Sequence, residues 1–341
     1  MRDGFRDLAG AAFWALGSTR PARAGRDRLT VVTFHRVLPA ELRRTYSFPG
    51  LVVTPEELDW FVGFFGRHYT VDTLAAALAR WQRAEPVDRP LLAITFDDGQ
   101  VDNFAYARPV LEKASLRATF FVASTHVEAG MPLWHDRLGL AVRAAVERRL
   151  PQLTDLLREL SVDAKVDGDP NGIASALASR AKALSSAERE ELIARAEKIA
   201  GSPSPPPWDG IMSWDQLRAL ASAGHEIGSH SMSHPILPLC SDSDLEREIV
   251  GSKAALEEHL QLEIASFCYP NGDCDARVAD AVHRAGYRQA VRAAGGPNRR
   301  GTSLFELGRC DVVVTNCLGS DGRLSEPRLA WRLSGFYPGA R

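Results

Sequence analysis

The stretch LLAITFDDGQ, Leu91–Gln100, places two adjacent acidic residues directly after six mostly apolar residues. A continuous apolar run of this length predicts a strand that is buried on both faces of a parallel sheet. Asp97 and Asp98 then lie at the carboxyl end of the strand, where parallel α/β folds collect their active sites. Because two neighbouring ionised carboxylates are costly to bury, the pair predicts a site that compensates their charge, such as a divalent cation.

Strand-like and helix-like segments alternate on both sides of this stretch. Leu29–Val37 is a second β-rich apolar run. Thr54–Tyr69 combines a Thr cap, a Pro at the first helical position and a Glu three residues after the cap, followed by apolar residues at helical spacing. The alternation resumes late in the chain with the helical patterns Ser213–Gly224 and Asp244–Leu260. Strands that are separated by helices imply parallel pairing, so the pattern predicts an α/β fold.

A segment rich in Ala, Leu, Arg and Glu interrupts this alternation. It contains a capping box, Ser185 to Glu188, and ends at the proline-rich GSPSPPP, Gly201–Pro207, which cannot be helical. We interpret the segment as a helical insertion. The expected organisation of the 341 residues is a lead-in segment (1–28), a main domain (29–320) with the insertion at about 135–207, and a C-terminal tail (321–341).

The bulk composition is that of a soluble globular protein, with 45% hydrophobic and 25% charged residues. Lys+Arg 41 against Asp+Glu 43 leaves a net charge of -2, and the basic residues are scattered. This balance argues against a nucleic-acid partner. Five cysteines, an odd number without a C-x-x-C pair, indicate free thiols in a reducing compartment.

The N-terminal segment contains an apolar run, Leu8–Leu16, that is too short to span a bilayer. Arginines around Phe13 and Trp14 would suit a short helix on a membrane surface. An ordinary amphipathic lead-in helix explains the same residues and is the preferred interpretation. We therefore expect a cytoplasmic protein, with peripheral contact at the inner face of the membrane through the N-terminus as the alternative.

A pair of histidines follows another predicted strand, in the sequence HSMSH. Two histidines four residues apart on one helical turn face the same way. Together with a carboxylate they form a three-ligand set with an open position, which suits zinc-like metals. We expect Asp98, His230 and His234 to bind a divalent cation, zinc in the first place, with cobalt, nickel or iron as alternatives. Asp97 would remain free to take a proton from metal-bound water.

These motifs carry a resemblance to a known family. TFDDG (Thr95–Gly99) followed by HSMSH (His230–His234) resembles the first two motifs of the NodB-type polysaccharide deacetylases, the fourth carbohydrate-esterase family. Both motifs match in full and in order, and the resemblance covers roughly Leu29 to Val314 apart from the insertion. It implies a distorted, incomplete (β/α) barrel and metal-dependent removal of acetyl groups from sugars. It also implies that Asp97 is the general base and that Asp98 and both histidines are the metal ligands.

The third motif departs from the usual pattern of the family. CYPNG, Cys268–Gly272, stands where an Arg-x-Pro-Pro-like motif is normal, and resembles the branch with an F-x-Y-P-x-G turn. The resemblance implies that the backbone N–H near Tyr269 helps to hold the oxyanion of the reaction. It places Pro270, Asn271 and Gly272 beside the substrate.

The last motif of the family, a Leu-x-His that supplies the general acid, has no counterpart after His283. His35, at the end of the first strand, is the substitute candidate, and a strand-end residue bonded to a loop is an equally compatible interpretation. Arg309 could replace the missing Arg by steadying Asp97, or it could form a surface ion pair with Asp311.

Two further positions have alternative interpretations. Trp134, followed by His135 and Asp136, is a candidate for lining a sugar-binding groove, because aromatic faces suit sugar rings; packing at the base of the insertion explains it as well. An acidic residue that caps a following helix is the ordinary interpretation of Asp102.

The leading hypothesis is a metal-dependent hydrolase that removes an acetyl group from an N-acetylated sugar of a polysaccharide or of a glycan precursor such as a lipid-linked sugar. The missing acid His and Arg leave a second hypothesis, a degraded enzyme that serves as a carbohydrate-binding or scaffolding subunit. A third is an amidase that cuts a non-sugar C–N bond, because the same four residues would serve it and the fold does not fix the substrate.

Overall fold

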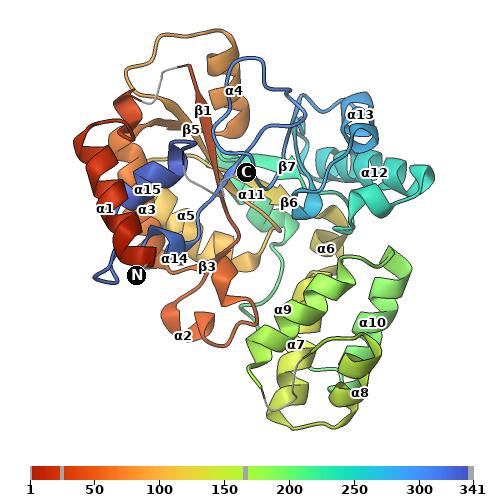
Figure 1. Ribbon diagram of the computed structural model, residues 1–341. Coiled ribbons are helices and arrows are strands. Elements are labelled where there is room, and N and C mark those ends of the chain that lie inside the picture. The colour runs from red at the N-terminus through yellow and green to blue at the C-terminus, as the bar shows by residue number, and fades with distance from the viewer. Residues whose placement is uncertain (1, 24–26, 164–167, 337–341) are drawn as a thin grey trace.

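The computed structural model describes residues 2–23, 27–163 and 168–336. Its centre is a curved, all-parallel sheet in the order β10-β1-β5-β6-β7-β8-β9, with β4 beside the first half of β5 (Figure 1). An isolated bridge joins Val291, the last residue of the end strand β9, to Leu307 in the segment that precedes β10. The predicted incomplete (β/α) barrel is confirmed. The strands are β1 (Leu29–Phe34), β4 (Thr70–Asp72), β5 (Leu91–Phe96), β6 (Thr119–Val122), β7 (Glu226–Ser229), β8 (Ser266–Cys268), β9 (Gln289–Val291) and β10 (Cys310–Asp311).

The strands β1 and β5 pair residue by residue along their whole length, and every residue of both is buried. Helices cover their outer side and the barrel interior covers the other, which explains the continuous apolar runs. Because the pairing ends at Phe34 and Phe96, the residues that follow, His35 and Asp97, emerge side by side at the carboxyl edge.

The first apolar run is not one strand as predicted. β1 ends at Phe34, and Arg36–Val37 forms a separate short strand, β2, which pairs with β3 (Val52–Val53). The chain leaves the main sheet between them because the Arg36 side chain turns inward to acidic partners described below.

Helices surround the barrel and start where the sequence predicts. Thr54 accepts a hydrogen bond from the Glu57 N–H, and the Glu57 side chain accepts one from the Thr54 N–H, so both halves of the capping box are formed. The outer helices are α2 (Ala40–Arg43), α3 (Pro55–His68), α4 (Leu74–Gln82), α5 (Arg108–Lys113), α6 (Ser124–Ala129), α11 (Trp214–Ser222), α12 (Asp242–Leu260), α13 (Ala276–Arg284) and α14 (Val314–Cys317).

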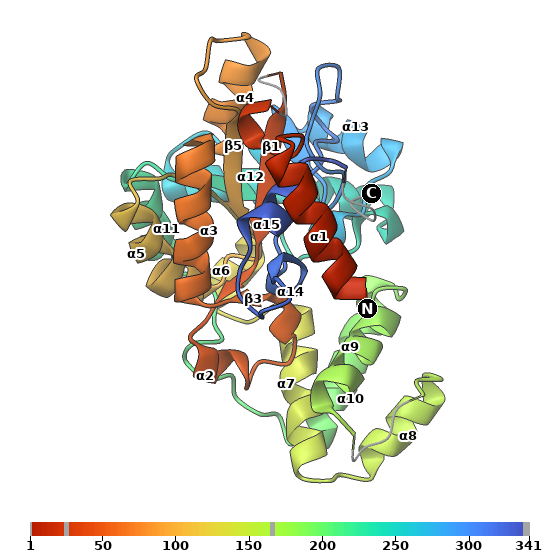
Figure 2. The same ribbon diagram turned by 60° about the vertical axis from the view of Figure 1, so that its left-hand side comes forward.

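The two ends of the described chain pack together. α1 (Arg2–Ala15) lies along α15 (Glu326–Leu333), and the ring centroids of Phe13 and Trp331 are 5.6 Å apart (Figure 2). Leu8 on α1 and Leu16, directly after this helix, are exposed. Within the described residues, no helix combines the length and the apolar character that crossing a membrane requires.

Between α6 and α11, the chain forms a helical unit that projects below the barrel in Figure 1. It has a hydrophobic core of its own, in which Leu138, Leu156, Leu177 and Ile193 are buried. We call this unit the insertion. Its helices are α7 (Trp134–Glu147), α8 (Gln152–Glu159), α9 (Pro170–Ala181) and α10 (Ser186–Ile199).

A buried ionic cluster joins the insertion to the barrel. Arg36 donates to Asp102 (Nε–Oδ2, 2.5 Å) and to Asp209 (Nη1–Oδ1, 2.7 Å), and its Nη1 lies 3.6 Å from Oδ1 of Asp136 on α7. Tyr46 donates its hydroxyl to Asp136 (2.6 Å), and its ring lies 4.6 Å from the guanidinium. All five side chains are buried. We call this set the Arg36 cluster.

The position of Asp102 differs from the expected helix cap. Its carboxylate accepts from Arg36 and from the Val37 N–H (2.8 Å), and the following turn, 103–107, is π-helical without a side-chain cap. The local sequence suggested a cap because it does not show that Arg36 lies next to this residue in space.

Candidate active site

Asp97 and Asp98 lie at the carboxyl end of β5, and each is 3% exposed. The N–H of Asp97 continues the strand pairing by donating to Phe34 (3.0 Å). Asp98 then adopts φ 74°, a conformation that costs a non-glycine residue about 1–3 kcal/mol. Gly99 follows at φ 71°, where an added Cβ would lie 2.8 Å from Val122. This tight turn directs the two neighbouring carboxylates to different partners.

The HSMSH motif is a loop after β7, not the helical turn that we expected. Ser231 and His234 both have positive φ, 66° and 57°. The loop is held from α12, where the carboxylate of Glu248 accepts from the Met232 and Ser233 N–H groups and from the Ser233 hydroxyl. One indication in the sequence that Glu248 has a buried partner is that this acid lies on the apolar face of its helix.

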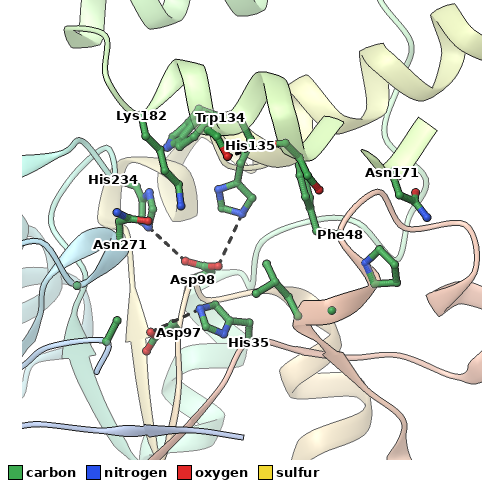
Figure 3. A pocket seen from close by; sticks show the side chains of 18 of the residues that line it. His35, Phe48, Asp97, Asp98, Trp134, His135, Asn171, Lys182, His234 and Asn271 are labelled. Carbon is green, nitrogen blue, oxygen red and sulfur yellow. Dashed lines mark hydrogen bonds and ion pairs between the residues drawn. The ribbon is translucent and has the colours of Figure 1, made fainter. Parts of the chain in front are cut away.

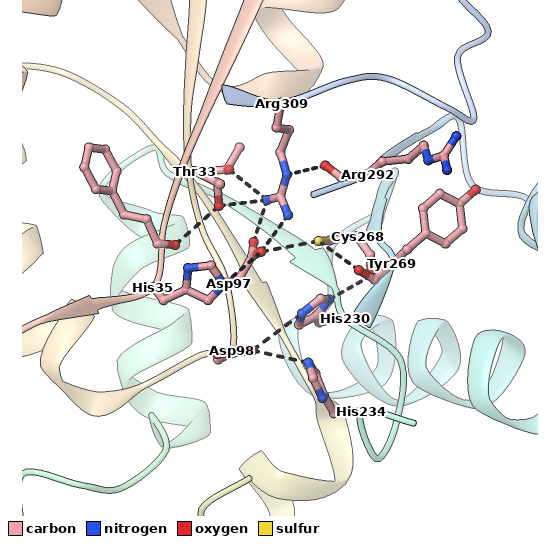
Figure 4. Close-up of polar contacts among 12 residues, drawn as sticks. Thr33, His35, Asp97, Asp98, His230, His234, Cys268, Tyr269, Arg292 and Arg309 are labelled. Atoms are coloured by element: carbon pink, nitrogen blue, oxygen red, sulfur yellow. Dashed lines mark hydrogen bonds and ion pairs between the residues drawn. The ribbon is translucent and has the colours of Figure 1, made fainter. Parts of the chain in front are cut away.

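Asp98 and the two histidines of this loop converge (Figure 4). Oδ1 of Asp98 lies 3.5 Å from Nε2 of His230 and 3.4 Å from Nε2 of His234. Nδ1 of His230 lies 2.7 Å from the Cys268 carbonyl, which can only accept, so Nδ1 carries a proton and Nε2 is the ring nitrogen that faces Asp98. Ligand atoms of a tetrahedral zinc site lie roughly 3.3–3.6 Å apart. The three residues therefore fit a divalent cation.

Asp97 is held by Arg309 and not by the metal-binding side chains. Nη1 and Nη2 of Arg309 each donate to one oxygen of Asp97, both at 2.7 Å, in the bidentate geometry of a strong ion pair. Arg309 is 2% exposed and also donates to the hydroxyls of Thr33 and Thr95. Of the two interpretations of Arg309, the structure shows the contact with Asp97. Burial alone would raise the pKa of Asp97, but Arg309 lowers it below its ordinary value.

His35 lies on the Asp97 side of the site. Its Nε2 is 3.9 Å from Oδ2 of Asp97, and 24% of its side chain is exposed to the cavity. Its backbone carbonyl accepts from the Asn103 side chain (2.9 Å). The two interpretations of His35 thus describe different atoms of one residue: the backbone is bonded to a loop and the ring faces the site.

His135 lies on the opposite side, in the first turn of α7. Its Nε2 is 3.8 Å from Oδ2 of Asp98 and 3.6 Å from Oδ1 of Asp136, and its ring centroid is 5.7 Å from that of His234. The sequence pattern pointed to His135 only through its neighbour Trp134. The insertion thus brings a fourth imidazole to the pair of aspartates, beside His35 and the two motif histidines, and no spacing rule could have indicated it.

The expectations for Tyr269 and Pro270 need correction. The Tyr269 N–H donates to the Val291 carbonyl (3.2 Å) as part of the sheet, and the residue does not line the cavity. Pro270 is buried behind the turn. Because the sheet continues to residue 269, the turn that faces the site starts later, with Asn271 (φ 58°) and Gly272 (φ 76°), and both line the cavity.

A cavity of about 660 Å³ opens over these residues (Figure 3). Its volume is typical of a small-molecule site. The barrel contributes both aspartates, His35, the two motif histidines and Arg309, and the insertion contributes the facing wall. Trp134 is 5% exposed, so it lines this wall and also packs in the core of the insertion.

The comparisons with known proteins agree with this geometry. A family model described as polysaccharide deacetylase matches residues 84–290, more than half of the chain. Similar folds include the deacetylase PplD of Streptococcus pyogenes in complex with acetate (15% identity, TM-score 0.56, 84% of this chain and 92% of that chain). They also include IcaB of Ammonifex degensii (18% identity, TM-score 0.56, 90% of this chain and 97% of that chain). A third similar fold is a de-N-acetylase of Aggregatibacter actinomycetemcomitans (14% identity, TM-score 0.52, 83% of this chain and 94% of that chain). The chain belongs to the polysaccharide deacetylase family.

Proposed function

We propose that this protein is a metal-dependent deacetylase that acts on an N-acetylated sugar of a polysaccharide or glycan precursor. The family match supports the reaction class. The observation that carries the proposal is the convergence of Asp98, His230 and His234 next to Asp97, in a cavity of suitable size. When bound by these ligands, a divalent cation supplies a Lewis acid that polarises the acyl carbonyl and lowers the pKa of water.

In this proposal Asp97 accepts the proton of the attacking water. Because its pKa is lowered, it is a weak base, and it therefore depends on a water whose own pKa is lowered as well. Arg309 fixes both oxygens of Asp97 and keeps the carboxylate ionised. The C–N bond then breaks, the nitrogen takes up a proton, and acetate and a free amine leave. Asn271 and Trp134 line the part of the cavity that would hold the sugar ring.

We assign protonation of the leaving amine to His35, with His135 as the competing group. His35→Asn is expected to lower kcat for an N-acetylated glycan about 100-fold, because general acids contribute typically 10²–10⁴-fold. Hydrolysis of 4-nitrophenyl acetate should fall far less, because that leaving group needs no proton. His135→Asn is the matched variant. If it shows this substrate-dependent loss and His35→Asn does not, the acid is His135.

Metal content is the direct test of the ligand set. We expect about one zinc, cobalt, nickel or iron ion per wild-type chain by mass spectrometry of the purified protein, and loss of that ion in Asp98→Ala and in His230→Ala. Asp88→Ala, which removes an exposed acid far from the site, should keep it. A wild-type protein that takes up no metal after reconstitution would contradict the proposal and favour a binding subunit.

Release of acetate tests the substrate class. The metal-loaded protein is incubated with N-acetylated oligosaccharides, and acetate and free amine are quantified. Equal amounts of both products, absent from Asp98→Ala, are expected. Turnover of simple amides without turnover of any N-acetylated sugar would instead support the amidase hypothesis.

A further inference from the structure

The wall of the cavity that faces the metal ligands belongs to α9. The cavity-lining residues of this helix recur every three or four positions and therefore lie along one side of it. The opposite side packs into the core of the insertion, with Ile173 and Leu177 buried. The lining side is polar and extends for about 16 Å, at 1.5 Å per residue. Its polar residues are Asn171, Ser175, Ser179 and, directly after the last turn, Lys182, and Gly172 and Ala178 line the cavity between them.

Lys182 is the residue of this wall that bears a positive charge. Its side chain points into the cavity on the side of His234 and Asn271 (Figure 3). The side chain is solvent-exposed and, within the described residues, has no hydrogen-bond or ion-pair partner. A cation at a helix C-terminus can serve the helix dipole. Arg180, in the last turn of α9, already supplies a cation for this purpose and does not line the cavity. The helix dipole therefore does not explain why Lys182 faces the cavity.

The carboxylates that share the cavity with Lys182 are engaged elsewhere. Asp97 pairs with Arg309, and Asp98 faces the motif histidines. The third, Asp169, caps α9 by accepting from two backbone N–H groups of its first turn, each at 3.1 Å. The cavity therefore presents an ammonium group that no carboxylate of its own lining neutralises.

A second, shallower cavity adjoins the first at Lys182. Its two acids, Asp273 and Asp275, are also occupied: Asp273 accepts from the Asn271 side chain (2.6 Å) and Asp275 from the Val278 N–H (2.8 Å). Neither forms an ion pair with Lys182. The ammonium group thus stands between two open spaces without an anionic partner from the described chain.

We propose that the substrate carries an anionic oxygen group, a carboxylate or a phosphate, close to its N-acetylated sugar, and that Lys182 binds this group. The inference rests on the proposed function, since it names the substrate class of the same site. The Asn171 side-chain carbonyl accepts from Arg143 (2.6 Å) and the Ser179 hydroxyl donates to the Ser175 backbone carbonyl (2.9 Å). The Asn171 NH2 group, the Ser175 hydroxyl and the lone pairs of the Ser179 oxygen are then left to bind the hydroxyls of the sugar chain. A charge-assisted hydrogen bond is about twice as strong as a neutral one, so Lys182 selects acidic over neutral glycans.

The test compares three probes by titration calorimetry with metal-loaded protein. The probes are chitotetraose, which is neutral, a hyaluronan tetrasaccharide, which carries carboxylates, and UDP-N-acetylglucosamine, which carries phosphates. Wild type is expected to bind one acidic probe about tenfold more tightly than the neutral one. Lys182→Gln should lose this preference and keep its affinity for chitotetraose within about twofold. Arg180→Gln is the matched control and should behave as wild type.

The outcomes separate the inference from the proposed function. Loss of affinity for the carboxylate probe alone, or for the phosphate probe alone, identifies the group. Equal binding of all three probes to wild type, no binding of either acidic probe at millimolar concentration, or an equal loss for all probes in Lys182→Gln overturns the inference. If acetate is released but acidic probes are not preferred, the proposed function is supported and the inference about Lys182 is contradicted. Acidic preference without acetate release from any probe supports the inference and contradicts the function.

Discussion

Asp97→Asn is expected to lower turnover by at least about 10²–10⁴-fold, the typical contribution of a general base, while the metal content stays at the wild-type level. The asparagine keeps the shape of the side chain but cannot accept the proton. Asp98, His230 and His234 are untouched by the change, so the ligand set remains. The measurement is kcat for acetate release, with metal content determined on the same sample. A kcat within tenfold of wild type at full metal occupancy would remove Asp97 from the role of base.

The same variant leaves Arg309 buried without its carboxylate, and this must be separated from the loss of a base. Breaking a buried ion pair by removing one partner costs about 3–5 kcal/mol. The double variant Asp97→Asn, Arg309→Met removes both charges and is expected to recover most of that stability in urea unfolding. It should not recover turnover. If the double variant regained activity, the defect of the single variant would lie in folding and not in chemistry.

Arg36→Met is expected to lower the free energy of unfolding by about 3–5 kcal/mol at pH 7. Methionine replaces much of the volume, but three carboxylates of the Arg36 cluster lose their cation while they remain buried. The measurement is the midpoint of urea unfolding. Arg43→Met is the control: Arg43 is half-buried and pairs with Glu57, so its loss should cost no more than about 1 kcal/mol. A loss for Arg36→Met as small as for the control would show that the cluster contributes little.

The pH dependence of this variant gives a second readout. Burial and the neighbouring Asp136 already raise the pKa of Asp209 to about 6 in the wild type, although Arg36 opposes them. The stability gained from a raised carboxyl pKa is complete below the unfolded value of about 4 and is lost as the pH rises through the folded value. Removal of Arg36 raises the pKa of Asp209 in the folded state further, because Arg36 is the cation that lowers it. The difference in the free energy of unfolding between wild type and Arg36→Met should therefore become smaller as the pH falls from 7 to 5.

The sequence predicted the parts of this protein that local patterns determine. The buried runs of β1 and β5 follow from continuous apolar residues, and α3 begins at a capping box that spans only four residues, Thr54–Glu57. Asp97 and Asp98 could be recognised as site residues because two charged side chains directly after a buried apolar strand are costly for packing. These features need no knowledge of the rest of the chain.

The remaining parts depend on residues that are distant in sequence. The histidine loop is non-helical because Glu248, on another element, binds its backbone. The Tyr269 N–H is unavailable because β9 pairs with it, and its local motif does not show where the sheet ends. The Arg36 cluster draws on residues 36, 46, 102, 136 and 209, which only the folded barrel and the docked insertion bring together.

The separate hydrophobic core of the insertion has a consequence for how this enzyme can diversify. Both aspartates and the motif histidines belong to the barrel, whereas α9 and its cavity-lining side chains belong to a unit with a hydrophobic core of its own. Substitutions along the cavity-lining side of α9 therefore leave both cores intact. If the proposed function holds, the residues of α9 that face the substrate can change without disturbing the aspartates and the motif histidines. The exception is the seam itself: Asp136 adjoins both Arg36 and His135, so a change there alters docking and catalysis together.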